Sequence, residues 1–167
     1  MLMVCGLGGI RWWGLNQSSM FCLHLREDRR VPYAFISIQP LDAQALEELA
    51  EDERCGATVV FRGVVRNHDG GQLVAGIQYS AHPFAEDALA DIAEGVAKRD
   101  QVHQVVVAHR VGDLEVGDDA FIAIVSAEHR AEAFSACLDI VEEIKTRVPI
   151  WKLQQFSNGS TSWSGLP

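Results

Sequence analysis

Two lysines close to the end of the chain, Lys145 and Lys152, are the residues of this sequence best suited to chemistry. A neutral lysine is a nucleophile or a general base, and a charged lysine can hold a phosphate. Pro149 stops the helix that carries Lys145 and redirects the chain, so the strand that carries Lys152 can fold back beside the helix end. Two ammonium groups that meet repel each other, so one of them should have a lowered pKa. This segment therefore predicts a cationic pocket with one reactive amine.

The helix expected over residues 129–146 determines how Lys145 is presented. At about 100° per residue, Lys145 lies in the middle of the apolar face of this helix. Its stem either passes the core and reaches water, or lines a pocket that awaits an anionic or electrophilic ligand. In a strand, Lys152 points away from Trp151 and Leu153, which favours the pocket. The apolar face of the helix comprises Phe134, Cys137, Leu138, Val141 and Ile144.

Hydrophobic periodicity predicts the elements that position this segment. Repeats at helical spacing predict three helices, over residues 42–55, 83–99 and 129–146, the first capped by Asp42. The turn signal at 69–71 joins two of the strands, 57–66 and 73–80, into a hairpin, and glycines within 112–119 mark a tight connection. Because hairpins alternate with helices, the fold class is α+β with a mostly antiparallel sheet. Runs rich in β-branched and aromatic residues predict strands over 33–38, 57–66, 73–80, 102–111, 120–126, 151–156 and 161–163.

Length and composition place limits on the function. The chain has 167 residues, 48% of them hydrophobic, and a net charge of −9. An acidic protein is a poor general binder of nucleic acid or of an anionic membrane, so a bound anion must lie in a local cationic pocket. No stretch approaches the roughly 20 apolar residues that span a bilayer. Residues 31–167 are predicted to form one domain, and residues 1–30 are interpreted as an N-terminal extension that is disordered or follows a mis-set start codon.

The spacing of cysteines and histidines indicates neither a disulfide nor a metal site. The four cysteines form no C-x-x-C pair and no zinc-ligand spacing with a histidine, which is typical of a reduced, cytoplasmic protein. Cys137 is expected in the core, whereas Cys55, at a strand entrance, could carry a persulfide. His82, His103 and His109 are interpreted as histidines on the surface or with satisfied hydrogen bonds, and not as metal ligands.

Four segments of the chain together resemble one protein family. They are residues 61–68 (FRGVVRNH), 109–114 (HRVGDL), 128–130 (EHR) and 145–152 (KTRVPIWK). In this order, and over residues 31–163, the chain is similar to the large, catalytic subunit of molybdopterin synthase. The last of the four segments is the most specific.

The resemblance implies an α/β-hammerhead fold and a cytoplasmic homodimer. Each protomer would bind one small ubiquitin-like subunit, which gives a heterotetramer. The implied reaction transfers sulfur from the thiocarboxylated C-terminal glycine of the small subunit to cyclic pyranopterin monophosphate, which becomes molybdopterin, and no cofactor is implied. The lack of an obvious sulfur-carrying cysteine agrees with a sulfur donor outside this chain.

The resemblance also implies roles for single residues. Lys145 and Lys152 match the catalytic lysines, and we expect the desolvated Lys145 to be the reactive amine and the wetter Lys152 to remain charged. His129 and Arg130 would reach the substrate phosphate across the dimer interface, and their place at a helix N-terminus suits an anion. Val64 stands where many members carry a basic residue, so its contact would be through the backbone. The expected substrate-binding residues are Arg66, Val64, Val65, His129, Arg130, Leu153 and Gln154, of which the last two replace a basic and an acidic residue.

Two further functions are compatible with parts of the same pattern. The cationic pocket could hold a phosphorylated metabolite in a non-catalytic binding module, which a covalent or sulfur-dependent event at Lys145 would exclude. An RNA-binding α+β domain would need a basic face with aromatic residues at alternating strand positions, and the net charge of −9 argues against it.

Overall fold

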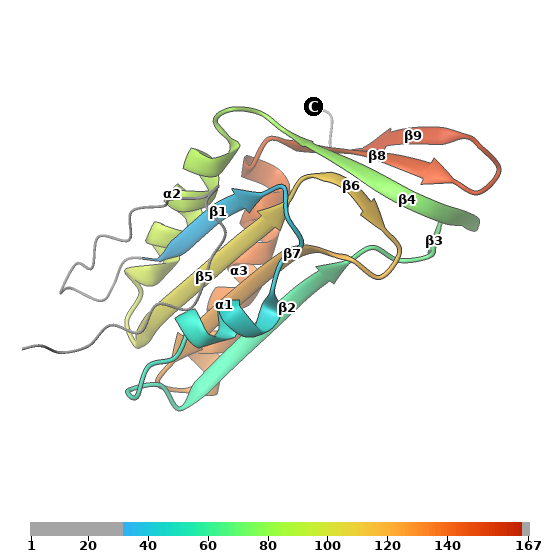
Figure 1. Cartoon of the computed structure of the whole chain (residues 1–167). Helices are drawn as coiled ribbons and strands as arrows, with labels where there is room; N and C mark the ends of the chain where they lie inside the picture. Colours follow the sequence, from blue (N-terminus) through green and yellow to red (C-terminus); the bar gives the residue numbers. More distant parts are fainter. Residues whose placement is uncertain (1–31, 165–167) are drawn as a thin grey trace, which may run out of the picture.

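Two β-sheets and three helices make up the part of the chain that the structure, a computed structural model, describes, residues 32–164 (Figure 1). The predicted α+β class, with mostly antiparallel strands, is confirmed. None of the three described helices is long and apolar enough to cross a membrane. The extension expected over residues 1–30 lies outside the described residues. In chain order the elements are β1 (Tyr33–Ser37), α1 (Ala43–Leu49), β2 (Ala57–Val64), β3 (His68–Asp69), β4 (Gln72–Ala81), α2 (Ala85–Ala97), β5 (Val102–Arg110), β6 (Gly112–Glu115), β7 (Asp119–Ala127), α3 (Arg130–Arg147), β8 (Ile150–Phe156) and β9 (Thr161–Ser164).

The central sheet has the order β1-β5-β7-β2, with α2 and α3 on one face and α1 on the other (Figure 1). β1 runs parallel to β5, and the other pairs are antiparallel. Along β5, Val105 and Val107 pack on the side of α2 and α3, whereas Val106 and Ala108 pack on the side of α1. Because both faces are covered, the strand reads as a continuous apolar run and not as an alternation of apolar and polar residues.

The second sheet has the order β3-β4-β8-β9, with β6 also paired to β4, and it projects beyond the ends of the helices (Figure 1). The hairpin expected between strands 57–66 and 73–80 is wrong, because β2 pairs with β7 and β4 pairs with β8. At the predicted turn, the strand that pairs with β4 is the two-residue strand β3, and not β2. After β2 the backbone of Val65 binds the neighbouring turn through Asp118 O (2.9 Å) and Gly117 N (2.8 Å). These bonds keep β2 in the central sheet, and the chain enters the second sheet at β3.

The connection between β5 and β7 contains a short strand where a tight turn was expected. β6 pairs with β4 from Gly112 opposite Tyr79 to Glu115 opposite Gly76. Gly112 and Gly117 have φ of 97° and 98°, a region that favours glycine. The glycines in the sequence therefore mark the two ends of β6, and this strand ties the connection to the second sheet.

The first helix is shorter than the sequence predicts. Asp42 caps it as expected, since its carboxylate accepts a hydrogen bond from the backbone N–H of Ala45 at 3.1 Å. The helix ends at Leu49, however, and not at the end of the predicted range 42–55. Asp52 accepts hydrogen bonds from the backbone and the side chain of Arg54, a local turn that competes with helical pairing.

The last helix, α3, buries only part of the apolar face that the sequence predicts. Phe134 and Leu138 are 64% and 61% exposed, whereas Ala133 and Ala136 are buried. Small side chains at the contact let a helix approach the sheet closely, and a helical wheel weighted towards large apolar side chains misses them. Cys137, Val141 and Ile144, the other members of the predicted face, are buried as expected.

Gly56, which precedes β2, lies against the end of β7. A Cβ atom at Gly56 would be 2.6 Å from the carbonyl oxygen of Glu128, so the backbone would have to shift. We expect Gly56→Ala to lower the free energy of unfolding by about 1–3 kcal/mol in urea denaturation. The matched control is Gly95→Ala, because a Cβ atom at Gly95, in the last turn of α2, meets nothing within 4 Å and alanine favours a helix. Equal effects of the two substitutions would contradict this prediction.

Candidate functional site

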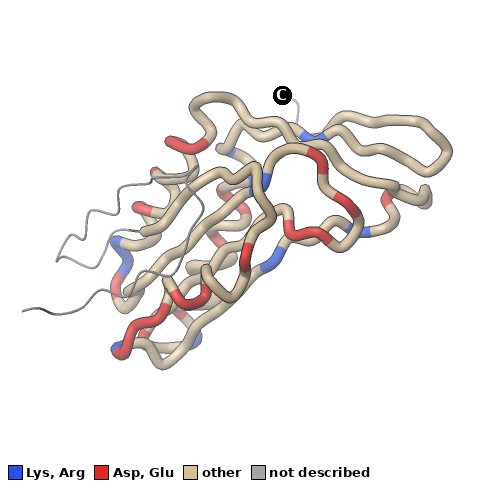
Figure 2. The backbone as a smooth tube through the Cα atoms, in the orientation of Figure 1, with Lys and Arg blue, Asp and Glu red and all other residues tan. Residues whose placement is uncertain are grey.

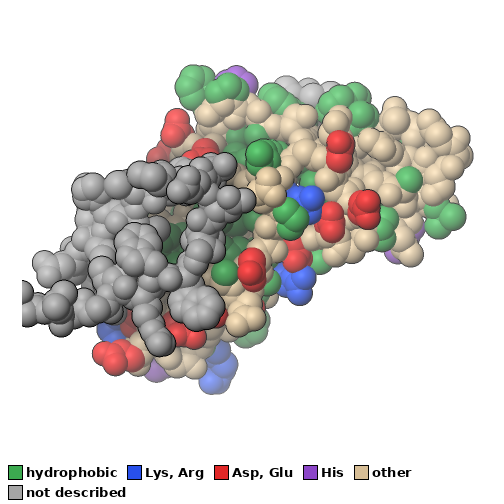
Figure 3. Space-filling model, in the orientation of Figure 1, with side chains coloured by type: hydrophobic (Ala, Val, Ile, Leu, Met, Phe, Trp, Pro, Cys, Tyr) green, Lys and Arg blue, Asp and Glu red, His purple; other side chains and the backbone are tan. Residues whose placement is uncertain are grey.

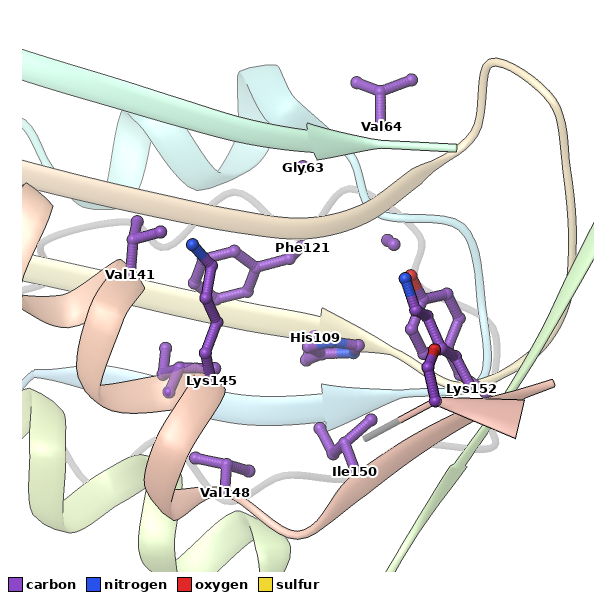
Figure 4. A pocket seen from close by; sticks show the side chains of 13 residues that line it. Gly63, Val64, His109, Phe121, Val141, Lys145, Val148, Ile150 and Lys152 are labelled. Carbon is purple, nitrogen blue, oxygen red and sulfur yellow. The ribbon is translucent and has the colours of Figure 1, made fainter. Parts of the chain in front are cut away.

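A pocket of about 360 Å³ lies where α3 ends and the second sheet crosses the central one (Figure 4). Residues from β2, β4, β5, β7, α3, β8 and β9 line it, so no single segment forms it. Lys145 reaches it from α3 and Lys152 from β8, on either side of His109 in this view. Val148 and Ile150, which flank the proline, lie below them. The predicted convergence of the two lysines on one pocket is confirmed.

Lys145 lies on the solvent side of α3. Its side chain is 64% exposed, and its ammonium donates a hydrogen bond of 2.9 Å to Glu142, one turn earlier in the helix. The expectation that Lys145 is desolvated in the middle of the core-facing stripe is wrong, because the buried side of α3 extends to Ala133, Ala136 and Ile140 and so leaves the lysine beside it. The two alternatives that the sequence left open for Lys145 are each correct in part, since its side chain reaches water and also lines the pocket.

Lys152 is the less exposed of the two lysines, which reverses the expectation that it is the wetter one. It is half-buried on β8, directly opposite Tyr79 on β4 and Ser164 on β9. Directly opposite residues of neighbouring strands project from the same face of a sheet and have Cβ atoms about 4.5–5.5 Å apart. The three side chains therefore form a row, and all three line the pocket.

Arg66 and Gln154, both expected to bind substrate, meet at Asp69. Arg66 forms an ion pair with Asp69, and the buried Gln154 donates a hydrogen bond to the same carboxylate. The hydrogen bond from Gln154, followed by the one from Arg66, holds the pKa of Asp69 below its usual range, and the positive charge of Lys152 acts in the same direction. An ionised Asp69 thus connects Arg66 to the strand that carries Lys152.

The apolar residues expected at the site separate into two groups. Val64, at the end of β2, is 48% exposed and lines the pocket. Val65 is buried in a small cluster with Leu114, and both of its backbone groups are used by the turn before β7. Leu153 alternates with Lys152 along β8 and so belongs to the other face of the sheet. The structure brings Val64 to the pocket, but neither Val65 nor Leu153.

His129 and Arg130 are exposed at the beginning of α3, and Lys145 is near its end. A helix of 18 residues is about 27 Å long. Within one chain these two residues therefore lie far from the pocket, and only a second protomer could bring them to it.

The charge of the pocket differs from that of the rest of the surface. Among the described residues its lining includes two lysines, a histidine, a tyrosine and a serine, and no carboxylate. Acidic residues gather instead at α1 and along β6 and the turn that follows it (Figure 2), and those at β6 stand out on the face drawn in Figure 3. In a chain with a net charge of −9, this pocket is the local cationic site that the sequence predicts. No group of three or more His, Cys, Asp or Glu side chains in the described part of the chain is placed to hold a metal ion.

Comparisons with known proteins identify the family. A family model described as MoaE protein matches residues 36–147. The chain belongs to the MoaE family. A relative from Nostoc, named molybdopterin synthase catalytic subunit, is 35% identical over 133 residues, which cover 78% of this chain and 81% of the relative. A relative from Mycobacterium tuberculosis, named molybdopterin synthase catalytic subunit 1, is 36% identical over 80% of this chain and 91% of its own length.

Solved structures agree with this assignment. The crystal structure of molybdopterin synthase from Staphylococcus aureus has a TM-score of 0.73 and 33% identity, and covers 80% of this chain and 97% of its own. The fold expected from the resemblance is therefore confirmed. The MoaE match ends at residue 147 and so includes Lys145, whereas Lys152 follows it.

In this MoaE chain, His109 is the main pocket residue to which the sequence assigned no functional role. It is 8% exposed and lies between the aromatic rings of Tyr79 and Phe121, at centroid distances of 5.2 and 5.8 Å. Its Nδ1 is 2.8 Å from the carbonyl oxygen of Arg110. The interpretation as a satisfied histidine is correct for Nδ1, but not for a surface position. Its position in β5 was the available signal. His109 is two residues after Val107, so its side chain points to the same face of the sheet, towards α2 and α3.

Burial of His109 makes the stability of this MoaE chain depend on pH. Burial lowers the pKa of His109 below 6.5, against the weaker effect of its hydrogen bond to Arg110. Below 6.5 the unfolded chain therefore binds a proton that the folded chain resists, and stability falls with pH until the folded-state pKa is reached. In urea denaturation, wild type should lose stability relative to His109→Gln between about pH 7 and about pH 5. If the difference in free energy of unfolding between wild type and His109→Gln stays constant across that pH range, the prediction is wrong.

Proposed function

We propose that this chain is the catalytic subunit of molybdopterin synthase and transfers sulfur to a pterin. The observation that carries the proposal is the convergence of Lys145 and Lys152 in a pocket whose described lining has no carboxylate, in a chain of the MoaE family. Two ammonium groups favour an anionic ligand, and the one carboxylate that pairs with either of them among the described residues, the exposed Glu142 beside Lys145, is outside the lining. Both the phosphate of a pterin precursor and the thiocarboxylate of a sulfur donor are anions.

The reaction proposed is the one that the resemblance implies. Cyclic pyranopterin monophosphate occupies the pocket, and the thiocarboxylated C-terminal glycine of a small ubiquitin-like subunit enters beside it and supplies sulfur. Lys145 is on a flexible stem at the exposed side, where its ammonium can leave Glu142 and move onto the ligands. Lys152 is more enclosed and holds charge next to Tyr79. When the ligands fill the pocket they exclude water from it, which strengthens the electrostatic interactions between the ligands and the two lysines. We assign this activity to the domain proposed over residues 31–167, in the cytoplasm.

We also propose that the site is shared between two protomers. Phe134 and Leu138 are exposed on the face of α3 that ends at Lys145, at the spacing of successive helical turns. Antiparallel pairing of two α3 helices about a twofold axis would bury these side chains. It would also place His129 and Arg130 of one protomer beside Lys145 of the other, in a homodimer that carries one small subunit per protomer.

The test is a reconstituted single turnover. The chain is mixed with cyclic pyranopterin monophosphate and a thiocarboxylated ubiquitin-like protein that ends in Gly-Gly. The expected result is a sulfur-containing pterin, together with the loss of mass that accompanies replacement of sulfur by oxygen on the small protein. Binding of the pterin without any change in the mass of the small protein would contradict the proposal and support the non-catalytic binding module.

A further inference from the structure

Three polar side chains of the pocket have no role in the function proposed so far. His109, Tyr79 and Ser164 come from β5, β4 and β9, and all three line the cavity with the two lysines. None of them carries a permanent charge. They therefore add no charge attraction to the binding of a phosphate, and they are available to another part of the ligand.

The hydrogen bonding of His109 determines which of its ring nitrogens is available. A carbonyl oxygen can only accept, so the 2.8 Å contact with Arg110 O requires the proton on Nδ1. In the neutral ring Nε2 is then a bare acceptor. The charged groups that face the pocket here are Lys145 from α3 and Lys152 from β8, while the guanidinium of Arg110 is bound to Asp118 at 2.9 Å. A third positive charge among them would be unfavourable, and burial acts in the same direction by lowering the pKa of His109.

Tyr79 and Ser164 extend this neutral surface across the second sheet. Tyr79 meets His109 edge to face, with ring centroids 5.2 Å apart, and stands opposite Lys152, which in turn stands opposite Ser164. The hydroxyl oxygen of Ser164 is buried and has no hydrogen-bond partner among the described residues. A buried hydroxyl without a partner costs free energy, which a ligand group placed against it would recover.

We propose that His109, supported by Tyr79 and Ser164, forms a neutral wall that recognises the heterocyclic ring of the ligand, with Nε2 of His109 accepting a hydrogen bond from a ring N–H. An ionised phosphate oxygen carries lone pairs and no proton to donate, so it would be repelled by Nε2 and directed to the lysines. A phosphorylated heterocycle with ring N–H donors, such as a pterin phosphate, satisfies both the lysines and Nε2 of His109. This inference rests on the proposed function and adds the residues that select the ring.

The experiment compares two substitutions of His109 with two ligands. His109→Phe keeps an aromatic ring against Tyr79 but removes the acceptor, whereas His109→Gln keeps a polar group close to the position of Nε2. Dissociation constants are measured by calorimetry for cyclic pyranopterin monophosphate and for inorganic phosphate. We expect His109→Phe to bind the pterin roughly tenfold more weakly than wild type, and His109→Gln to recover most of that loss. Phosphate affinity should stay within about twofold in both variants.

Tyr79→Phe provides a second variant that does not depend on His109. It keeps the edge-to-face packing and removes only the hydroxyl, and we expect weaker pterin binding with unchanged phosphate binding. In turnover, each of these losses should raise KM while kcat stays within a few-fold, the pattern of a binding contact.

The outcomes separate this inference from the function on which it rests. Equal pterin affinity of wild type, His109→Phe and Tyr79→Phe would overturn the neutral wall and leave sulfur transfer intact. An equal loss of phosphate and pterin affinity in His109→Phe would overturn it as well, because the histidine would then act on the whole pocket. If wild type binds phosphate but not the pterin, both the wall and the proposed function are wrong.

Discussion

Replacing Lys145 by alanine is expected to lower the single-turnover rate of sulfur transfer by roughly 10²–10⁴-fold, the range typical of a lost acid–base group. The reason is its position at the pocket, and not the burial that the sequence suggested. The amine is on a mobile stem whose only described partner is Glu142, so it is free to reach the reacting groups. Binding of the pterin should weaken less than turnover, because Lys152 still faces the ligand.

Two control substitutions isolate the effect of Lys145. Lys98→Ala removes an exposed lysine that follows α2 and pairs with Glu94, a similar surface ion pair away from the pocket, and it should leave the rate unchanged. Glu142→Gln removes the partner of Lys145 and keeps the amine, so the rate should stay within a few-fold of wild type. Normal turnover of Lys145→Ala would mean that this pocket is not the site of sulfur transfer.

Lys152 should respond differently because it is half-buried in the row between Tyr79 and Ser164. Lys152→Ala should weaken pterin binding as well as turnover, since the charge held against the ligand is lost. Lys152→Arg keeps the charge with a different geometry and should recover part of the binding. If Lys152→Ala is inactive with unchanged binding while Lys145→Ala is active, the roles of the two lysines are reversed.

The second large effect is expected from mixing two inactive variants. Lys145→Ala and His129→Ala should each abolish most of the activity as homodimers. An equal mixture, after subunit exchange, should recover about a quarter of wild-type activity, because half of the dimers are mixed and each has one complete site of two. The physical reason is the length of α3, which separates His129 from Lys145 within one chain by most of its 18 residues.

The control for this experiment is a mixture in which both substitutions are in the same chain. A protomer that carries both Lys145→Ala and His129→Ala, mixed with either single variant, leaves no complete site, so no activity should return. Size-exclusion chromatography with light scattering checks that dimers are present in each mixture. No recovery in mixed dimers of the two single variants would show that each site is built from one chain.

Local patterns in the sequence determined most of the elements and the character of the pocket. The β-branched runs located β5 and β7, Asp42 was identified as a cap, and the helix with Lys145 near its end was followed, as expected, by a proline and a strand with Lys152. These features depend on neighbours within a few residues, whose side chains and turns act on the backbone directly. The convergence of the lysines was predictable for the same reason, since Pro149 forces the chain to reverse within a short segment.

Only the tertiary structure decided which strands pair and which side chains face the pocket. β2 could pair with β4 across its turn, but bonds between Val65 and the 117–118 turn keep it with β7. The buried face of α3 includes two alanines, which carry little weight in a hydrophobic pattern, and it leaves Phe134 and Leu138 outside the core. His109 became a pocket residue because β4, β7 and β8, distant in sequence, meet around it. Such choices depend on packing between remote segments, and a single sequence does not encode that packing in its local periodicity.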